Sequence, residues 1–132
     1  MPAGYSNTPL YKKLGLKKGL RIRLVHAPAH YADLLGEPIE VVAPTANEVD
    51  FIHLFTNSLS ELKRLLPALK DTLAKTGVLW VSWYKKSSGK QTDLTETLVR
   101  ETGLGAGLVD VKVCAVDEDW SGLKFMYRLK DR

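Results

Sequence analysis

The sequence has a single cysteine, no long hydrophobic run and no hydrophobic leader. The one thiol, Cys114, cannot form a disulfide within the chain, which fits a reducing compartment. Apolar runs such as residues 78–83 are far shorter than the roughly 20 residues that span a bilayer. Residues 1–13 lack the apolar stretch of a secretory signal. We therefore expect no membrane span and a cytoplasmic protein.

Acidic residues are absent before Asp33, whereas the same stretch is rich in basic residues and the chain carries a net charge of +4. The basic residues are Lys12, Lys13, Lys17, Lys18, Arg21 and Arg23. This basic N-terminal region fits either a patch for nucleic acid or another acidic partner, or an ordinary solvated surface, which is favoured. Few aromatic residues lie among these lysines, so the region lacks the stacking platform of single-strand-binding proteins.

Turn residues and periodic apolar positions predict the elements of the first half. A short helix over residues 9–14 would have Thr8 as its N-cap, Pro9 as its first residue and Gly15 just past its end. A second short helix ends at Gly36. Strands are expected at residues 20–25, 39–43, 50–55 and 78–83.

Leucines at helical intervals predict the longest helix between residues 58 and 77. Ser58 and Glu61 have the spacing of a capping box at its start, and Gly77 is expected to end it. Pro67 lies inside the pattern, where it removes one backbone hydrogen bond and crowds the preceding turn. We therefore predict a kink or a break at Pro67.

The last third predicts one more helix and a hairpin. Asp93 and Glu96 match a second capping box, and their helix is expected to end near Gly103. Residues 109–116 and 123–129 both alternate apolar and polar side chains, and the short segment between them suits an antiparallel hairpin.

Strand, helix and strand in repetition predict an α/β fold in one domain over residues 1–132, with residues 1–18 as a short helical arm. We expect a three-layer Rossmann-like sandwich, with a mostly parallel sheet of about six strands and an antiparallel C-terminal hairpin. Residues 44–49 are too short for the usual crossover between parallel strands. Either an extended segment crosses the sheet there, or one strand of that pair is antiparallel.

Several stretches carry a resemblance to known families. GLKKGLRIRLV before a loop and helix, LLPALKDTLAKTGVLWVSW, and the terminal hairpin resemble the S-adenosylmethionine-dependent methyltransferase fold from about Gly15 to Leu129. WYKKSSGKQTDLTE and VDVKVCAVDEDWSGLKF look like a bacterial family of short domains of unknown function. This second resemblance implies a methyltransferase-like fold and brings no activity with it.

The loop after the first strand departs from the methyltransferase pattern. That family has a glycine-rich loop at this place, because the backbone must pass close to the cofactor. Here residues 26–30 read His-Ala-Pro-Ala-His, and Pro28 removes an amide donor. The acid that ends the second strand in the family is replaced by Ala43 and Pro44, since Glu40 lies mid-strand. The sequence therefore disfavours the usual binding of the methyl donor, and we assign no cofactor.

Ligands of open α/β sheets gather beyond the carboxyl ends of the strands. Lysines and serines after the fourth expected strand would favour a phosphate or carboxylate there. A solvated basic loop is the simpler interpretation of that stretch. Trp120, at the expected hairpin tip, either anchors a ligand or folds back onto the sheet, which is favoured. The candidate ligand-binding residues are His26, Asn57, Lys85, Lys86, Ser87, Ser88 and Trp120.

The histidines and the cysteine predict no metal site and no nucleophile. His26 and His30 are four residues apart, but Pro28 argues against a helix between them and a zinc site needs three or more protein ligands. His53, mid-strand, is expected to be a core residue making one hydrogen bond. Cys114 lies among alternating valines and is expected to be an inert buried thiol.

Three functions remain, and whether the protein is an enzyme stays open. The first is a non-catalytic domain that binds an anionic small molecule or a nucleotide at the strand ends. The second is an interaction module that binds protein or nucleic acid through the basic N-terminal region. The third is a divergent S-adenosylmethionine-dependent methyltransferase.

Overall fold

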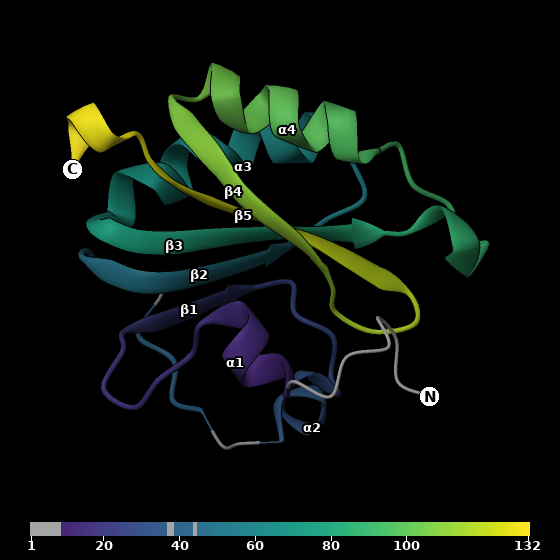
Figure 1. Ribbon diagram of the computed structural model, residues 1–132, viewed down its shortest axis with the longest axis horizontal. Coiled ribbons are helices and arrows are strands. Elements are labelled where there is room, and N and C mark those ends of the chain that lie inside the picture. The colour runs from purple at the N-terminus through teal and green to yellow at the C-terminus, as the bar shows by residue number, and fades with distance from the viewer. Residues whose placement is uncertain (1–8, 37–38, 44) are drawn as a thin grey trace.

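The computed structural model describes residues 9–36, 39–43 and 45–132. Within them a five-stranded sheet runs in the order β1-β2-β3-β5-β4 (Figure 1). The strands are β1 (Ile22–Val25), β2 (Val49–Phe55), β3 (Leu73–Tyr84), β4 (Leu108–Ala115) and β5 (Trp120–Tyr127). The predicted α/β class is confirmed.

The sheet is mixed rather than mostly parallel. β1 pairs with β2 and β2 with β3 in parallel, whereas β5 pairs with both β3 and β4 in antiparallel fashion. The antiparallel C-terminal hairpin was predicted and is confirmed. Because β5 lies between β3 and β4 instead of at an edge, the hairpin supplies two of the four strand pairings.

The sixth strand expected at residues 39–43 is wrong. This segment makes only one parallel bridge, between Val41 and Ile22, and the Val42 amide donates to the Ile22 carbonyl at 2.8 Å. Val41 is 56% exposed, whereas Ile39 and Val42 are half-buried against the core, so the segment packs on the protein without forming a strand ladder. The chain from β1 to β2 therefore holds one helix and this extended segment, and the two flanking strands are parallel without a short crossover.

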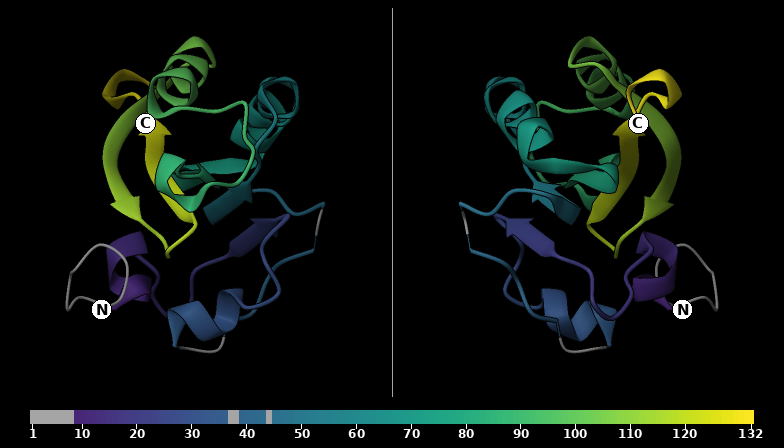
Figure 2. Two further views of the ribbon diagram at one scale, coloured as in Figure 1. Left: turned by 90° about the vertical axis from the view of Figure 1, so that its right-hand side faces the viewer. Right: turned by 90° about the vertical axis from the view of Figure 1, so that its left-hand side faces the viewer.

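Helices cover both faces of the sheet, as the two views of Figure 2 show. α1 (Leu10–Leu14) and α2 (Tyr31–Leu35) lie on one face, and α3 (Leu59–Thr72) and α4 (Glu96–Gly105) lie on the other. Two single-turn helices, η1 (Lys86–Ser88) and η2 (Leu129–Asp131), follow β3 and β5. The three layers agree with the predicted sandwich.

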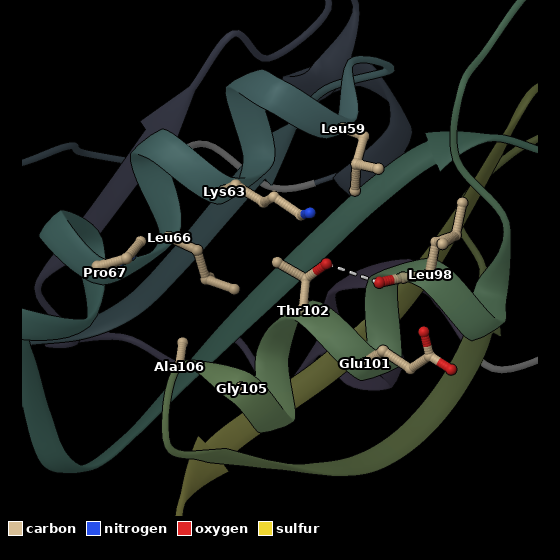
Figure 3. Close-up of a pocket in the computed structure, with 9 residues that line it drawn as sticks. All are labelled: Leu59, Lys63, Leu66, Pro67, Leu98, Glu101, Thr102, Gly105 and Ala106. Atoms are coloured by element: carbon tan, nitrogen blue, oxygen red, sulfur yellow. Dashed lines mark hydrogen bonds between the residues drawn. The ribbon is translucent and has the colours of Figure 1, made fainter.

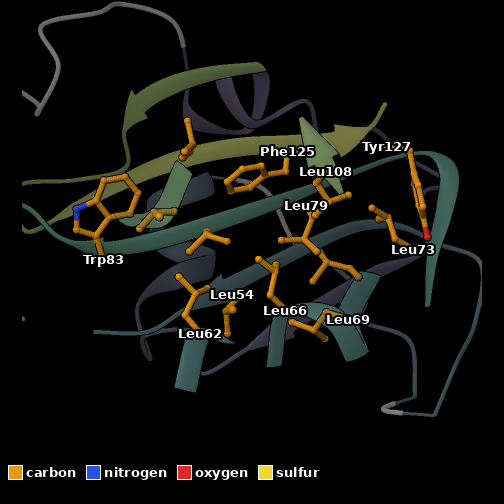
Figure 4. Packing of buried hydrophobic residues seen from close by; sticks show 14 of the residues in the cluster. Leu54, Leu62, Leu66, Leu69, Leu73, Leu79, Trp83, Leu108, Phe125 and Tyr127 are labelled. Atoms are coloured by element: carbon orange, nitrogen blue, oxygen red, sulfur yellow. The ribbon is translucent and has the colours of Figure 1, made fainter. Parts of the chain in front are cut away.

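Alternation along the strands divides the core between the two faces. In β2, Ile52 and Leu54 pack with α3, whereas Phe51 and Phe55 pack with α1 and α2. Figure 4 shows the larger cluster, in which leucines of α3 meet β3 and the aromatic ring of Phe125. Full burial of such side chains contributes roughly 1.5–3 kcal/mol each to folding.

The ends of α1, α2 and α3 differ in part from the expectations. Gly15 and Gly36 end α1 and α2 in the left-handed conformation, as predicted. Pro9 is the N-cap of α1 and not its first residue, and the expected cap Thr8 lies outside the described residues. Pro67 lies inside a continuous α3, which ends at Thr72 rather than near Gly77. Of the predicted kink or break at Pro67, the break is wrong, because Leu66 and Leu69 on both sides of it keep packing in the core.

Gly77 and Asp93 have other roles than those predicted. Gly77 lies inside β3, where a Cβ atom would come within 3.0 Å of the Val49 and Asp50 carbonyls. The N-cap of α4 is Thr95, whose side chain accepts from the Leu98 amide. Asp93 instead accepts a hydrogen bond from the Leu59 amide at 3.3 Å, at the start of α3.

Candidate functional site

The carboxyl ends of the three parallel strands lie at one edge of the sheet, the strand-end rim. The left view of Figure 2 looks onto this edge, with the β4–β5 turn beside it. His26 follows β1, Asn57 lies two residues after β2, and Lys85 follows β3. The structure thus places these three expected site residues at one edge of the sheet.

His26 forms the corner after β1 with a left-handed backbone. Its φ is 57°, a conformation that glycine adopts freely and that non-glycine residues adopt at a cost of about 1–2 kcal/mol. The side chain is 57% exposed, and its Nδ1 lies 3.4 Å from Oε1 of Glu61. The corner therefore has a backbone conformation typical of glycine although the sequence has histidine there.

Glu61 is a rim residue that sequence reasoning placed only in a helix cap. Ser58 accepts from the Glu61 amide at 3.2 Å, as the capping box predicts. The Glu61 carboxylate does not return to the Ser58 amide. It accepts from the buried Thr56 hydroxyl at 2.6 Å and faces His26. The pair of His26 and Glu61 thus joins the end of β1 to the first turn of α3.

Asn57 holds the ends of β2 and β3 together. Its side-chain oxygen accepts from the Tyr84 amide at 2.7 Å, and its backbone carbonyl accepts from the Asp93 amide at 2.9 Å. The Thr92 hydroxyl also donates to the Asn57 carbonyl, at 3.5 Å. Both oxygens of Asn57 are therefore engaged within the protein.

The predicted basic loop turns through the single-turn helix η1 just beyond β3. The Lys85 amide donates to the Asp119 carbonyl at 2.8 Å, and the Ser88 hydroxyl accepts from the Lys90 amide at 3.1 Å. Lys86 and Ser87 are exposed. The loop thus presents its lysines at the rim while its backbone is tied to the β4–β5 turn.

Trp120 folds back onto the sheet instead of standing free at the hairpin tip. Its ring meets Phe55 edge-on at 4.9 Å between centroids and Tyr84 at 4.4 Å. The indole is half-buried. Tyr84 at the end of β3 and Trp120 at the start of β5 therefore give the rim an aromatic floor.

Carboxylates of the β4–β5 turn make the charge of the rim mixed. Asp117 Oδ2 lies 3.2 Å from His30 Nε2, and Asp119 Oδ2 lies 2.9 Å from Lys90 Nζ. The hydrogen bond to Asp119 raises the pKa of Lys90. These contacts join residues far apart in sequence, so no local spacing could have revealed them. Lys85 and Lys86 are thus the lysines through which the rim would attract an anion.

A buried polar chain lies beneath the rim. The Tyr31 hydroxyl is 2.8 Å from His53 Nδ1, and His53 Nε2 is 2.7 Å from the Ser82 hydroxyl. His53 and Ser82 are fully buried, and burial lowers the pKa of His53 to about 3. His53 is therefore the core residue that was predicted, but it makes two hydrogen bonds instead of one.

Two hollows lie elsewhere on the described surface. One, of about 390 Å³, lies between α3 and α4, with Leu66 and Leu98 as apolar walls and Lys63 and Glu101 at its mouth (Figure 3). The Thr102 hydroxyl there donates to the Leu98 carbonyl at 2.7 Å. The other, of about 680 Å³, lies near the start of β1. Its lining residues are Tyr11, Leu16, Lys17, Lys18, Gly19, Leu20, Ile22, Ile39 and Glu40. Neither contains a predicted ligand residue.

Two arginines of the basic N-terminal region bind within the protein. The buried Arg23 donates to the Thr72 hydroxyl at 2.8 Å and to the Ala46 carbonyl at 2.6 Å, and its Nε has no partner among the described residues. Arg21 donates to the Asn47 carbonyl at 3.0 Å. The basic region is therefore less exposed than its composition indicates.

The described part of the chain contains no group of three or more histidine, cysteine, aspartate or glutamate residues able to hold a metal ion. Its helices are also too short or too polar to cross a bilayer. Cys114 is half-buried, and burial raises the pKa of its thiol.

Comparison with solved structures shows a methyltransferase-like fold. No protein-family model and no curated protein sequence matches the chain. A SAM-dependent methyltransferase from Aquifex aeolicus superposes with a TM-score of 0.65 at 20% identity, over 90% of this chain and 88% of that one. Aeropyrum pernix fibrillarin with natively bound S-adenosyl-L-methionine gives 0.60 at 15% identity, over 89% and 73%.

A third structure agrees with these two. The TehB-like SAM-dependent methyltransferase from Corynebacterium glutamicum gives a TM-score of 0.57 at 9% identity, over 96% of this chain and 91% of that one. At such identities the likeness establishes a Rossmann-like, methyltransferase-like fold, and function must be argued from the site.

Proposed function

We propose that this protein binds a small anionic molecule of the nucleotide class at the strand-end rim. The observation that supports the proposal is the position of His26, Asn57 and Lys85 after three neighbouring parallel strands. Ligands of open α/β sheets bind at this edge. The aromatic floor of Tyr84 and Trp120 would contact a flat base, and the lysines would contact a phosphate.

The roles of the rim residues differ in this proposal. Lys85 and Lys86 supply positive charge, and the exposed imidazole of His26 supplies a hydrogen bond. Ser87 and Ser88 supply hydroxyls beside them. Asn57 keeps the ends of β2 and β3 at a fixed spacing, because its oxygens are already bonded. No residue of the rim is assigned a catalytic step, so the proposal is a binding protein.

Thermal denaturation with AMP, ADP, inorganic phosphate and acetate tests this proposal. A bound ligand raises the melting temperature with the logarithm of its concentration above Kd. We expect a nucleotide to stabilise the wild type and the Lys85→Ala, Lys86→Ala double variant to lose that shift. Lys63→Ala with Arg64→Ala, an exposed cation pair on α3, is the matched control and should keep it. Equal shifts in both variants would contradict the rim as the site.

A second candidate is a divergent S-adenosylmethionine-dependent methyltransferase. The solved structures with this fold include one with natively bound S-adenosyl-L-methionine, which favours the idea. The left-handed corner at His26 also has the backbone conformation that a glycine-rich loop would need. Against it, Pro28 removes one amide from that loop. Titration calorimetry with S-adenosylmethionine separates the two candidates, since no heat at millimolar donor would exclude the methyltransferase.

A further inference from the structure

Two lysines lie directly opposite each other in the β4–β5 hairpin. Lys112 of β4 is in register with Lys124 of β5. Directly opposite side chains on one sheet face have Cβ atoms about 4.5–5.5 Å apart, and like charges there destabilise the pair. Lys124 is also in register with the buried Trp80 of β3. This pair therefore places two positive charges at the border of the core.

A third lysine reaches the same face from α1. Lys13 Nζ donates to the Ala115 carbonyl of β4 at 3.2 Å. The next residue, Leu14, accepts from the Trp80 indole at 2.9 Å, which fixes the end of α1 over β3. Figure 2 shows the C-terminal end of β4 beside α1. Lys13, Lys112 and Lys124 thus come from three separate segments, and we call them the hairpin lysines.

The acids of the hairpin do not neutralise these charges. Asp110 faces α4, where it lies 2.9 Å from Arg100, and Asp117 and Asp119 pair with His30 and Lys90. Among the described residues, no ion pair within 4.0 Å involves a hairpin lysine. The cluster is therefore positive without an internal counter-charge.

The pKa directions agree with this geometry. Burial lowers the pKa of Lys124, and the charge of Lys112 lowers it further. Burial raises the pKa of the Cys114 thiol, whereas the charges of Lys13 and Lys112 both lower it. Lys13 and Lys112 therefore act in the same direction on the pKa of this thiol. Bringing these charges together is unfavourable unless an anion joins them.

We propose that Lys13, Lys112 and Lys124 form a binding site for a phosphate group. Ammonium groups bind phosphate oxygens as point charges, and a multiply charged oxyanion would relieve the repulsion between the opposed Lys112 and Lys124. The site lies on the hairpin face that looks away from α4, and none of its residues belongs to the strand-end rim. The phosphate belongs either to a free polyphosphate or to a nucleic-acid backbone.

Thermal denaturation with sodium pyrophosphate at low ionic strength tests the free form of the ligand. We expect pyrophosphate to raise the melting temperature more than sodium chloride of equal ionic strength. The Lys112→Gln, Lys124→Gln double variant should melt higher than the wild type without ligand, because the repulsion is gone, and should lose the pyrophosphate shift. Lys63→Gln with Arg64→Gln removes the same charge elsewhere and should keep the shift.

Fluorescence anisotropy with a labelled oligonucleotide tests the polymeric form. Affinity should fall with salt, and the double variant should bind more weakly with a salt slope smaller by about two. If only pyrophosphate raises the melting temperature, the ligand is a free polyphosphate. If the labelled oligonucleotide binds, the ligand is nucleic acid. The proposal is overturned if neither exceeds the salt control, or if the double variant responds like the wild type. Lys85→Ala with Lys86→Ala should leave both responses intact, which separates this site from the rim.

Discussion

His53 Nδ1 lies 2.8 Å from the Tyr31 hydroxyl in a part of the core that water does not reach. The imidazole also stacks on Phe55 at 4.2 Å between ring centroids. Burial penalises the charged imidazolium, so the folded protein keeps His53 neutral down to a pKa of about 3. The unfolded chain has an ordinary histidine that binds a proton near pH 6.5.

This difference predicts that stability falls as the pH drops from 6.5 towards 3. In that window His53 binds a proton in the unfolded state but stays neutral in the folded state. Each pH unit therefore lowers the free energy of unfolding by up to about 1.4 kcal/mol. Urea unfolding at pH 7, 6, 5 and 4 measures the slope. His53→Phe should flatten it, whereas Tyr31→Phe should lower stability by about 1–3 kcal/mol and keep the slope. A slope unaffected by His53→Phe would show that other groups cause the acid sensitivity.

Two glycines of α4 should respond to alanine in opposite directions. A Cβ atom on Gly103 would collide with the Phe125 ring, whereas one on Gly105 meets nothing within 4 Å. We expect Gly103→Ala to lower the free energy of unfolding by about 1–3 kcal/mol through overpacking. Gly105→Ala should raise it by about 0.5–1 kcal/mol, because alanine is the better helix former. Chemical denaturation of both variants checks the packing of α4, and equal effects would contradict it.

Replacement of Pro67 should stabilise α3. An alanine there restores the amide that can donate to the Lys63 carbonyl, and the change in helix propensity stabilises the folded state by about 3 kcal/mol. The unfolded chain becomes more flexible without the proline, which offsets up to about 1 kcal/mol of this gain. We expect a net increase of about 2 kcal/mol for Pro67→Ala. Ala68→Gly, at the neighbouring exposed position, should lower stability by about 1 kcal/mol and shows that the helix responds to propensity. A loss of stability in Pro67→Ala would show that the ring packs usefully in the α3–α4 hollow.

The left-handed corner at His26 predicts a large difference between two substitutions. Glycine adopts φ near 57° without strain, whereas a β-branched residue rarely does. His26→Val should therefore be less stable than His26→Gly by about 1–3 kcal/mol. Glu48, with φ 54°, offers the same comparison at a position away from the rim. Equal stability of the two His26 variants would exclude a left-handed corner.

The sequence predicted the elements whose signals are local. The caps at Gly15, Gly36 and Ser58 and the alternation of the hairpin strands lie within a few residues of what they determine. Residues 39–43 are apolar enough for a strand, but a strand also needs a partner, and Ile22 offers only one bridge. Strand pairing depends on segments that are distant in the sequence, so composition alone predicted more strands than the sheet contains.

The same limit applies to the candidate site. The rule that ligands gather at strand ends located His26 and Lys85 correctly at one edge. It did not find that Asp117 reaches His30 across 87 residues, or that Glu61 turns towards His26. The opposition of Lys112 and Lys124 depends on the register, which shifts at an irregularity between Asp110 and Lys112. Such details follow from the packed structure rather than from any spacing.

The bonds of Asn57 decide which experiments on the rim can be interpreted. Its amide oxygen and its carbonyl together join two strand ends to the segment that leads into α4. Removing this side chain would break the hydrogen bond between the ends of β2 and β3. A loss of ligand binding in Asn57→Ala would therefore report damage to the scaffold and not the loss of a ligand contact. Lys85 and the exposed Lys86 are the positions at which recognition and architecture can be varied separately.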